Sequence, residues 1–229
     1  MLEDPPILTI SRRIARPDPA LLAAFRDMPT GFVVDSMEGR GALDHRIKPV
    51  DPDRAAFVGV ALTCQCGPGD NLAILGAISV AEAGDVIVAA ADGFLDLAVM
   101  GDRVAGMARN RGAVGLVTDA AVRDTPGIRA VGLPCFAGGV TPNSCAASGP
   151  GTVGLPVVIG GIAVASGDLL IADCDGVVVV PQARIAAIGA RVREVAAAET
   201  AMDARVVAGL AMPGRISDLE RAGKLRFLD

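Results

Sequence analysis

The chain alternates between short apolar runs that predict strands and longer apolar stretches that predict helices. The run 57–64 (FVGVALTC) predicts a buried strand, 70–83 predicts a helix that Asp70 caps, and 86–89 (VIVA) predicts a second strand. Turns that contain glycine separate these segments. Such alternation is typical of α/β folds, in which helices pack against the faces of a sheet. We therefore expect an α/β protein.

The same alternation continues along the rest of the chain. Further helices are predicted at 19–27, 30–39 and 102–111, and further strands at 114–118, 134–137 and 156–164. The segment 138–154 is rich in Gly, Pro, Ser and Thr and predicts a long loop, a kind of segment that is usually functional or mobile. The runs 169–172 and 177–180 predict a hairpin, and 182–209 predicts a long C-terminal helix before a polar tail. Strands joined by helices and strands joined by a hairpin together predict a mixed sheet.

Composition limits the domain organisation and the partners. The 229 residues are enough for one large or at most two small domains, and no linker or repeat divides them, so we expect one domain over 1–229. A net charge of −5 argues against nucleic acid, which binds to basic surfaces. No apolar run reaches the roughly 20 residues of a membrane span, and the acidic N-terminus lacks the features of a signal peptide. We expect a cytoplasmic protein without nucleic-acid or membrane partners.

Side chains suited to covalent or proton chemistry are scarce. Of the 21 basic residues only Lys48 and Lys224 are lysines, His45 in a predicted loop is the one histidine, and tyrosine is absent. The five cysteines lack zinc-ligand spacing, and we expect most of them to be small buried side chains in a reducing compartment: Cys64, Cys66, Cys135, Cys145 and Cys174. Acid–base chemistry therefore falls on carboxylates, water or a metal ion.

The segment Gly101-Asp102-Arg103-Val104 begins a predicted helix and is the first candidate site. The first N–H groups of a helix are unpaired and carry partial positive charge, so a helix start can hold a carboxylate or a phosphate. The alternative is that Asp102 serves only as the helix N-cap. The sequence alone leaves both interpretations open.

The second candidate is Arg123-Asp124, which follows a buried strand, where open α/β sheets usually bind ligands. An arginine can bind a carboxylate through two parallel hydrogen bonds, and an adjacent aspartate can bind a hard cation. Alternatively, Asp124-Thr125-Pro126 is a good helix cap with proline in the first turn. Here too both interpretations stay open.

The spacing of the two candidates resembles a family signature. Gly101-Asp102, twenty further residues and then Arg123-Asp124 is similar to the D-x20-R-D pattern of the RraA-like family. That family includes the class II 4-hydroxy-4-methyl-2-oxoglutarate/4-carboxy-4-hydroxy-2-oxoadipate aldolases and the regulator of ribonuclease activity A. The resemblance extends over about residues 20–210 and includes Gly69-Asp70-Asn71, 111–119, 139–142, 160–164 and 175–181.

The resemblance implies a swivelling β/β/α-type sandwich that assembles as a homotrimer, or as a hexamer of two trimers, with sites between subunits. It also implies a site for Mg²⁺ or Mn²⁺. Asp124 would ligate the metal, Asp102 would hold a metal-bound water, and Glu199 on the C-terminal helix of a neighbouring subunit would complete the outer shell.

The resemblance further implies a small keto-acid substrate. Arg123 would bind its pyruvyl carboxylate, helped by the backbone N–H groups of Arg103 and Val104 at the helix start that follows Gly101. The implied activity is aldol cleavage that releases pyruvate, with oxaloacetate decarboxylation through the same enolate. The loop and tail positions of the two lysines argue against a Schiff base and agree with a metal mechanism. The alternative implied role is a non-catalytic regulator that binds a ribonuclease.

One position departs from the family pattern. The family usually has Asp-Gly before the Arg-Asp turn, whereas this chain has Asp119-Ala120. If that position requires a positive φ, an alanine strains the loop that carries Arg123. The backbone conformation of Ala120 therefore bears directly on the geometry of the candidate site.

Overall fold

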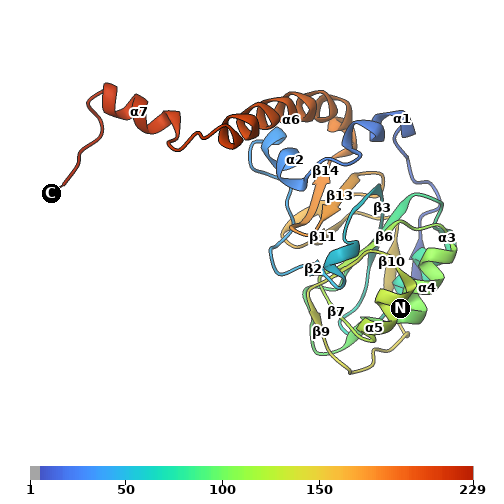
Figure 1. Ribbon diagram of the computed structural model, residues 1–229. Coiled ribbons are helices and arrows are strands. Elements are labelled where there is room, and N and C mark those ends of the chain that lie inside the picture. Colours follow the sequence, from blue (N-terminus) through green and yellow to red (C-terminus); the bar gives the residue numbers. More distant parts are fainter. Residues whose placement is uncertain (1–5, 229) are drawn as a thin grey trace, which may run out of the picture.

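The computed structural model describes residues 6–228 and contains a central mixed sheet with helices around it (Figure 1). Four parallel strands form its middle: β3 (Phe57–Gln65), β4 (Asp85–Ala90), β6 (Gly115–Thr118) and β8 (Cys135–Ala137). The last three are buried along their whole length. Strands covered on both faces carry nearly continuous apolar runs, which is the pattern that the sequence shows.

Antiparallel strands complete the sheet on both sides. β2 (Lys48–Pro49) pairs with β8, and β13 (Leu169–Asp173) pairs with β3 and forms a hairpin with β14 (Gly176–Val180). β10 (Gly151–Val153) pairs with the end of β3, and β1 (Leu8–Ile10) runs parallel to β10. The expected mixed sheet and the expected hairpin are therefore confirmed.

Two smaller sheets accompany the central one. β5 (Ala98–Met100), β7 (Ala121–Val122) and β9 (Gly139–Val140) form a parallel three-stranded sheet. β11 (Val157–Ile159) and β12 (Ile162–Val164) form a hairpin. The three-stranded sheet matters most for function, because the chain leaves β5 and β7 at the two candidate segments.

Three helices pack on one side of the central sheet: α3 (Leu72–Val80), α4 (Asp102–Asn110) and α5 (Thr125–Val131). Their apolar side chains join those of the sheet in one core, which includes Leu62, Ile74, Ile87, Ala105, Leu116 and Ile128. Burial of these aliphatic side chains contributes the main stabilisation of this side of the molecule. Figure 1 shows α3, α4 and α5 grouped beside β6 and β10.

A separate core lies at the other end of the molecule, over β13 and β14. It contains α1 (Pro19–Leu22), η1 (Ala23–Phe25), α2 (Thr30–Ser36) and the first part of α6 (Ile185–Val207). Two further short 3₁₀ turns are η2 (Pro52–Arg54) and η3 (Gln182–Arg184). The expected long C-terminal helix is confirmed, and it lies far from α4 and α5 in Figure 1.

The C-terminal helix buries only its beginning, through Ile185, Ile188, Gly189 and Val192. The remainder extends beyond the body of the molecule, and α7 (Gly214–Arg221) follows it (Figure 1). The tail expected here is polar, but it contains a helix that the sequence interpretation did not predict. The segment GRISDLER is mostly polar and none of it is buried, so it has no apolar run from which a helix could be predicted.

Several predicted boundaries were also wrong. The loop predicted at 138–154 spans only 141–150, because the sheet continues through β9 and β10 at its two ends. The strand predicted at 156–164 is split by the Gly160-Gly161 turn, where both glycines have positive φ. The helix predicted at 19–27 is an α-helix only to Leu22 and continues as a 3₁₀ turn to Phe25, and the second predicted helix ends early, at Ser36.

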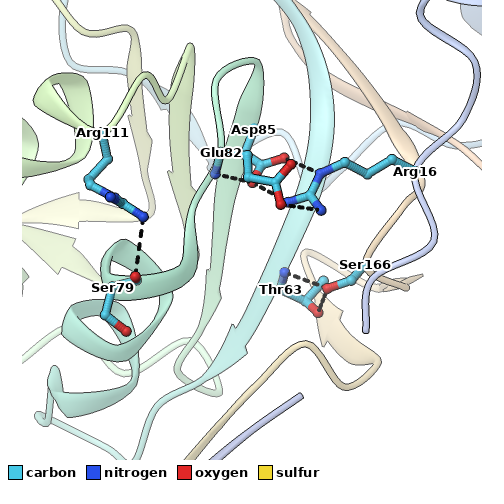
Figure 2. A network of polar contacts seen from close by, with 7 residues as sticks. All are labelled: Arg16, Thr63, Ser79, Glu82, Asp85, Arg111 and Ser166. Carbon is cyan, nitrogen blue, oxygen red and sulfur yellow. Dashed lines mark hydrogen bonds and ion pairs between the residues drawn. The ribbon is translucent and has the colours of Figure 1, made fainter. Parts of the chain in front are cut away.

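An arginine ties the segment before α1 to the central sheet (Figure 2). The Arg16 guanidinium donates two hydrogen bonds to the buried Asp85 carboxylate, at 3.2 and 2.8 Å, and pairs with Glu82 at 3.2 Å. The hydrogen bonds to Asp85 raise the pKa of Arg16 above its ordinary value. Beside this pair, the Thr63 N–H donates to the Ser166 hydroxyl at 2.9 Å. A bidentate pair such as Arg16–Asp85 fixes the relative position of the two segments as well as adding stability.

Candidate functional site

The first candidate segment lies at the beginning of α4. Gly101 occupies the N-cap position and Asp102 is the first helical residue, so the alternative in which Asp102 is the N-cap was wrong. The Asp102 carboxylate accepts the Arg103 N–H at 2.7 Å. Within residues 6–228 the Val104 N–H has no acceptor, and Ala105 is the first residue of the helix whose N–H donates to a backbone carbonyl, that of Gly101. The helix start therefore keeps an N–H group available for an anion.

The second candidate segment lies at the beginning of α5. Asp124 has a left-handed backbone conformation (φ 56°, ψ 40°), and its carboxylate makes no capping hydrogen bond to the helix. Instead, its Oδ2 lies 3.4 Å from the Arg123 Nε, and the two side chains are 47% and 41% exposed. A left-handed conformation outside glycine costs about 1 kcal/mol or more and often marks a functional site.

Parallel pairing of β5 and β7 brings the two segments together. Met100 pairs with Val122, and the Arg123 N–H donates to the Met100 carbonyl at 3.0 Å. Because parallel strands end at the same edge, the residues that follow them meet there. A Cβ on Gly101 would collide with the Asp124 carboxylate, so the close approach requires glycine. The long spacing in the sequence is thus the length of chain that runs from β5 through α4 and β6 to β7.

A pocket of about 640 Å³ opens at this edge. It is lined by Asn71, Ala98, Met100, Gly101, Asp102, Arg103, Val104, Met107, Arg123, Asp124 and Cys145. Every residue expected from the two segments is therefore in one place. Glu199 does not line the pocket, because α6 packs at the other end of the molecule. Its contribution from a neighbouring subunit stays a prediction.

Of the pocket residues from outside the two segments, the sequence interpretation missed Asn71 and Met107, whereas Cys145 lies in the loop that the sequence indicated as functional. Asn71 follows Gly69-Asp70 at the start of α3, Met107 lies one turn into α4, and Cys145 comes from the loop 141–150. The glycine and serine content of that loop was the available signal for Cys145. In the same loop the Ser144 hydroxyl accepts a hydrogen bond from Arg123 Nη1.

A buried carboxylate holds this loop in place. One Asp70 oxygen accepts the Leu72 N–H at 2.9 Å, and the other accepts the N–H groups of Ser148 at 2.6 Å and Gly149 at 3.0 Å. Burial raises the pKa of Asp70, but the three N–H donors outweigh it, and the net pKa is below the ordinary value. Asp70 thus positions the segment that carries Cys145, a thiol whose pKa burial raises.

Ala120 is accommodated without strain. The described non-glycine residues with positive φ are Asp27, Glu38, Asp92 and Asp124, so Ala120 has an ordinary backbone conformation. It is fully buried, and its carbonyl accepts the Gly138 N–H at 2.9 Å. The condition under which an alanine here would strain the loop, a positive φ, is therefore not met. Neighbouring Asp119 accepts backbone N–H groups of residues 91 and 93, although burial raises its pKa.

The donor set at the pocket suits a hard cation held by few protein ligands. The described part of the chain has no cluster of three or more His, Cys, Asp or Glu side chains that could hold a metal by itself. The pocket does present the two carboxylates of Asp102 and Asp124. Mg²⁺ is commonly bound by one or two carboxylates together with water and substrate oxygens. The residues present therefore fit Mg²⁺ or Mn²⁺ and do not fit a structural zinc ion.

Other chemically capable side chains lie elsewhere. Lys48 is exposed and its Nζ donates to the Asp175 carbonyl, Lys224 is exposed near the C-terminus, and His45 is exposed in a loop. Cys64 and Cys66 are buried in the core, as expected for most of the cysteines, together with Cys135; Cys174 is exposed. Across residues 6–228 no helix has both the length and the apolar character of a membrane span.

Comparison with known proteins assigns the family. The chain matches the RraA-like family model, described as Aldolase/RraA, over residues 30–179, so the protein belongs to the RraA-like family. A protein of Halalkalibacterium halodurans named "Putative 4-hydroxy-4-methyl-2-oxoglutarate aldolase" is 39% identical over 161 residues, which cover 70% of this chain and 76% of that protein. The resemblance drawn from the two segments is thereby confirmed.

Solved structures share the fold. The RNA-processing inhibitor RraA from Thermus thermophilis has a TM-score of 0.63 and 31% identity, and the match covers 68% of this chain and 94% of that chain. Streptomyces coelicolor RraAS2, described as an unusual member of the RNase ES inhibitor RraA protein family, has a TM-score of 0.75 and 26% identity, over 83% and 100% of the two chains. The RraA-type fold that the sequence implied is confirmed.

Proposed function

We propose that this protein is a divalent-metal-dependent aldolase that cleaves 4-hydroxy-4-methyl-2-oxoglutarate or 4-carboxy-4-hydroxy-2-oxoadipate and releases pyruvate. The observation that carries the proposal is the position of Arg123 and Asp124 opposite the Asp102 helix start, in one pocket without a lysine. The name of the Halalkalibacterium halodurans relative supports the reaction class.

Arg123 binds the C1 carboxylate of the keto acid. Its guanidinium is half-exposed in the pocket and oriented by Asp124 and by the Ser144 hydroxyl, which leaves N–H donors directed to a ligand. The Val104 N–H and the positive end of α4 add a second attraction for the same anionic group. The Arg103 N–H, by contrast, is already bonded to Asp102.

Asp124 would ligate Mg²⁺ or Mn²⁺, and Asp102 would contribute through a water molecule. When bound, the cation acts as a Lewis acid on the 2-oxo group and stabilises the negative charge that develops during cleavage. Glycines at 101 and 127 keep the space around both carboxylates open, since a Cβ on Gly127 would lie 2.6 Å from Asp102 Oδ2. Glu199 of a neighbouring subunit completes the site, in a homotrimer or a hexamer.

Cleavage begins when a site carboxylate, or a water that it holds, takes the proton of the C4 hydroxyl. The electron pair of that O–H bond forms the new carbonyl as the C3–C4 bond breaks, and the electrons of the broken bond pass to C3 as the enolate of pyruvate. Protonation at C3 then gives pyruvate. Loss of CO₂ from oxaloacetate leaves the same enolate, so decarboxylation accompanies the aldolase activity.

Pyruvate release tests the proposal. The protein is incubated with 4-hydroxy-4-methyl-2-oxoglutarate, and separately with oxaloacetate, in Mg²⁺ and then in excess EDTA. We expect release in Mg²⁺, loss in EDTA and recovery on adding Mg²⁺ back. Arg123→Ala abolishes release, whereas substitution of the exposed Arg13 by alanine leaves it unchanged. A rate of pyruvate release that is unchanged by EDTA, or full activity in Arg123→Ala, would contradict the proposal.

A regulator of ribonuclease activity is the second candidate, because two similar structures are described as RNA-processing or RNase inhibitors. A regulator acts through its surface, so its binding to a ribonuclease would survive Arg123→Ala. Co-purification with, and inhibition of, an RNase E-type nuclease by both wild type and variant, without pyruvate release by either, would favour this role over the aldolase.

A further inference from the structure

The candidate pocket contains an arginine side chain that has no role in the proposed reaction. Two arginines line it, Arg103 and Arg123. Arg123 contacts Asp124 and Ser144, which orient its guanidinium. In the proposed function this guanidinium holds the C1 carboxylate. The Arg103 guanidinium is exposed and, within the described residues, makes no ion pair and no side-chain hydrogen bond. An uncommitted arginine at a binding pocket is a ready partner for an anionic group.

Arg103 belongs to the pocket wall formed by α4. It lies in the first turn of that helix, and Met107 lies four residues later on the same face, where it also lines the pocket. The wall therefore presents one charged group at its beginning and an apolar surface beyond it. Arg123 and Asp124 come from the start of α5, a different element, so the two guanidinium groups lie on separate walls.

The remaining lining residues offer no other cation. The loop 141–150 contributes Cys145, and α3 contributes Asn71, both uncharged at neutral pH. The pocket volume of about 640 Å³ lies within the range of sites that bind ligands of drug size, far larger than a three-carbon acid requires. A substrate that fills it extends from Arg123 across the pocket.

Charge points in the same direction. The four charged side chains of the pocket, two aspartates and two arginines, carry no net charge together. A bound divalent cation leaves two positive charges, and the Glu199 carboxylate proposed from a neighbouring subunit lowers this to one. The site therefore stays positive and does not repel a second substrate carboxylate.

We propose that Arg103 binds a second carboxylate at the far end of the substrate and thereby selects dicarboxylic over monocarboxylic 2-keto acids. The assignment rests on the proposed function, in which Arg123 and the cation hold the pyruvyl end. Arg103 is a specificity-determining residue, and the proposed reaction assigns it no proton to transfer.

A matched pair of ligands tests the assignment without turnover. Both 2-oxoglutarate and 2-oxopentanoate have five carbons and no C4 hydroxyl, and only the first has a distal carboxylate. Titration calorimetry in Mg²⁺ is expected to show that the wild type binds 2-oxoglutarate about tenfold more tightly, the size of one charge-assisted contact. Arg103→Met removes the preference, and Arg103→Lys keeps part of it. Arg109→Met, on the same helix but outside the pocket, keeps all of it.

Three results would overturn the assignment: equal affinity of the wild type for the two ligands, a preference that persists in Arg103→Met, or binding of neither ligand. Failure of the proposed function has a different signature. A protein that discriminates between the ligands through Arg103 but releases no pyruvate would keep this assignment and reject the aldolase. A protein that releases pyruvate without such discrimination would do the reverse.

Discussion

Two aspartates precede helices in this molecule, and their surroundings are opposite. Asp70 lies before α3, is 6% exposed, and has its carboxylate bonded to three backbone N–H groups. Asp124 lies before α5, has a side chain that is 47% exposed, and faces a guanidinium instead of the backbone. One carboxylate is fully used by the fold, whereas the other is left available for a ligand.

The contrast between the Asp70 and Asp124 carboxylates shows that an aspartate just before a helix can serve either stability or ligand binding. Hydrogen bonds to charged groups stabilise a fold by about 1.5–3 kcal/mol, so Asp70 repays its burial. Asp124 makes no such contacts and adopts a left-handed conformation that adds a cost of about 1 kcal/mol. A residue that contributes little to stability and yet occupies a strained position is best explained by its chemistry. Substitutions at the two sites should therefore change different properties.

The largest effect is expected from Asp124→Asn. Loss of the carboxylate that ligates the cation should lower pyruvate release on the order of 10²–10³-fold, while the free energy of unfolding stays within about 0.5 kcal/mol. Steady-state kinetics and urea unfolding measure the two quantities. Asp27→Asn is the matched control, because Asp27 is also an exposed aspartate with positive φ (59°) and lies outside the pocket. A large stability loss in Asp124→Asn, or equal activity loss in Asp27→Asn, would contradict the distinction.

The next effect is expected from Asp70→Asn, and it falls on stability. The amide NH₂ faces N–H donors of the loop 141–150, so unfolding should become easier by about 1–3 kcal/mol at pH 7. Activity should fall less than in Asp124→Asn, since only the position of the loop changes. Unchanged stability would show that the three N–H bonds do not hold the loop.

Acid should erase this stability difference. The pKa of Asp70 is lower in the folded protein than in the unfolded chain, so its contribution is complete above the ordinary aspartate pKa of about 3.9. The contribution is lost as the pH falls through the lowered folded-state pKa. Urea unfolding of wild type and Asp70→Asn at a series of pH values should therefore converge below pH 3.9. A difference that grows in acid would refute the assigned direction.

A smaller effect is expected from a single methyl group at Gly101. In Gly101→Ala the new Cβ collides with the Asp124 carboxylate and displaces it, so activity should fall roughly tenfold with little change in unfolding. Gly106→Ala in the same helix has its nearest contact at 3.9 Å. It should raise stability by about 0.5–1 kcal/mol and keep full activity. Equal kinetics for the two variants would show that the approach of Gly101 to Asp124 is unimportant.

The sequence predicted the parts of the site that depend on local pattern. Apolar runs identified the buried strands. Capping patterns predicted helices that begin near Asp102 and just after Arg123, as the structure shows. Pairing of β5 with β7 was not predicted, because strands of two or three residues carry too little periodicity. The place of Asn71 in the pocket depends on contacts between distant segments, which no local pattern encodes, whereas composition did indicate the loop that carries Cys145.

Two further outcomes follow from tertiary context. The family pattern left open whether Ala120 strains the loop, and the ordinary backbone conformation there shows that the alanine is tolerated. Helix α7 was missed because it buries nothing in this chain, and burial of an apolar face is what makes most helices recognisable. Glu199 lies on the C-terminal helix beyond its last buried residue, Val192, so no contact within one subunit could have indicated a role for it.

Exchange of the methyl protons of pyruvate tests the central claim most directly, because it requires the enolate but no particular aldol substrate. Pyruvate is incubated with the protein in D₂O and followed by proton NMR. The account predicts loss of the C3 proton signal in Mg²⁺, none in EDTA, and none in Arg123→Ala or Asp124→Asn. Absence of exchange in the wild type with Mg²⁺, or exchange that persists in both variants, would contradict it.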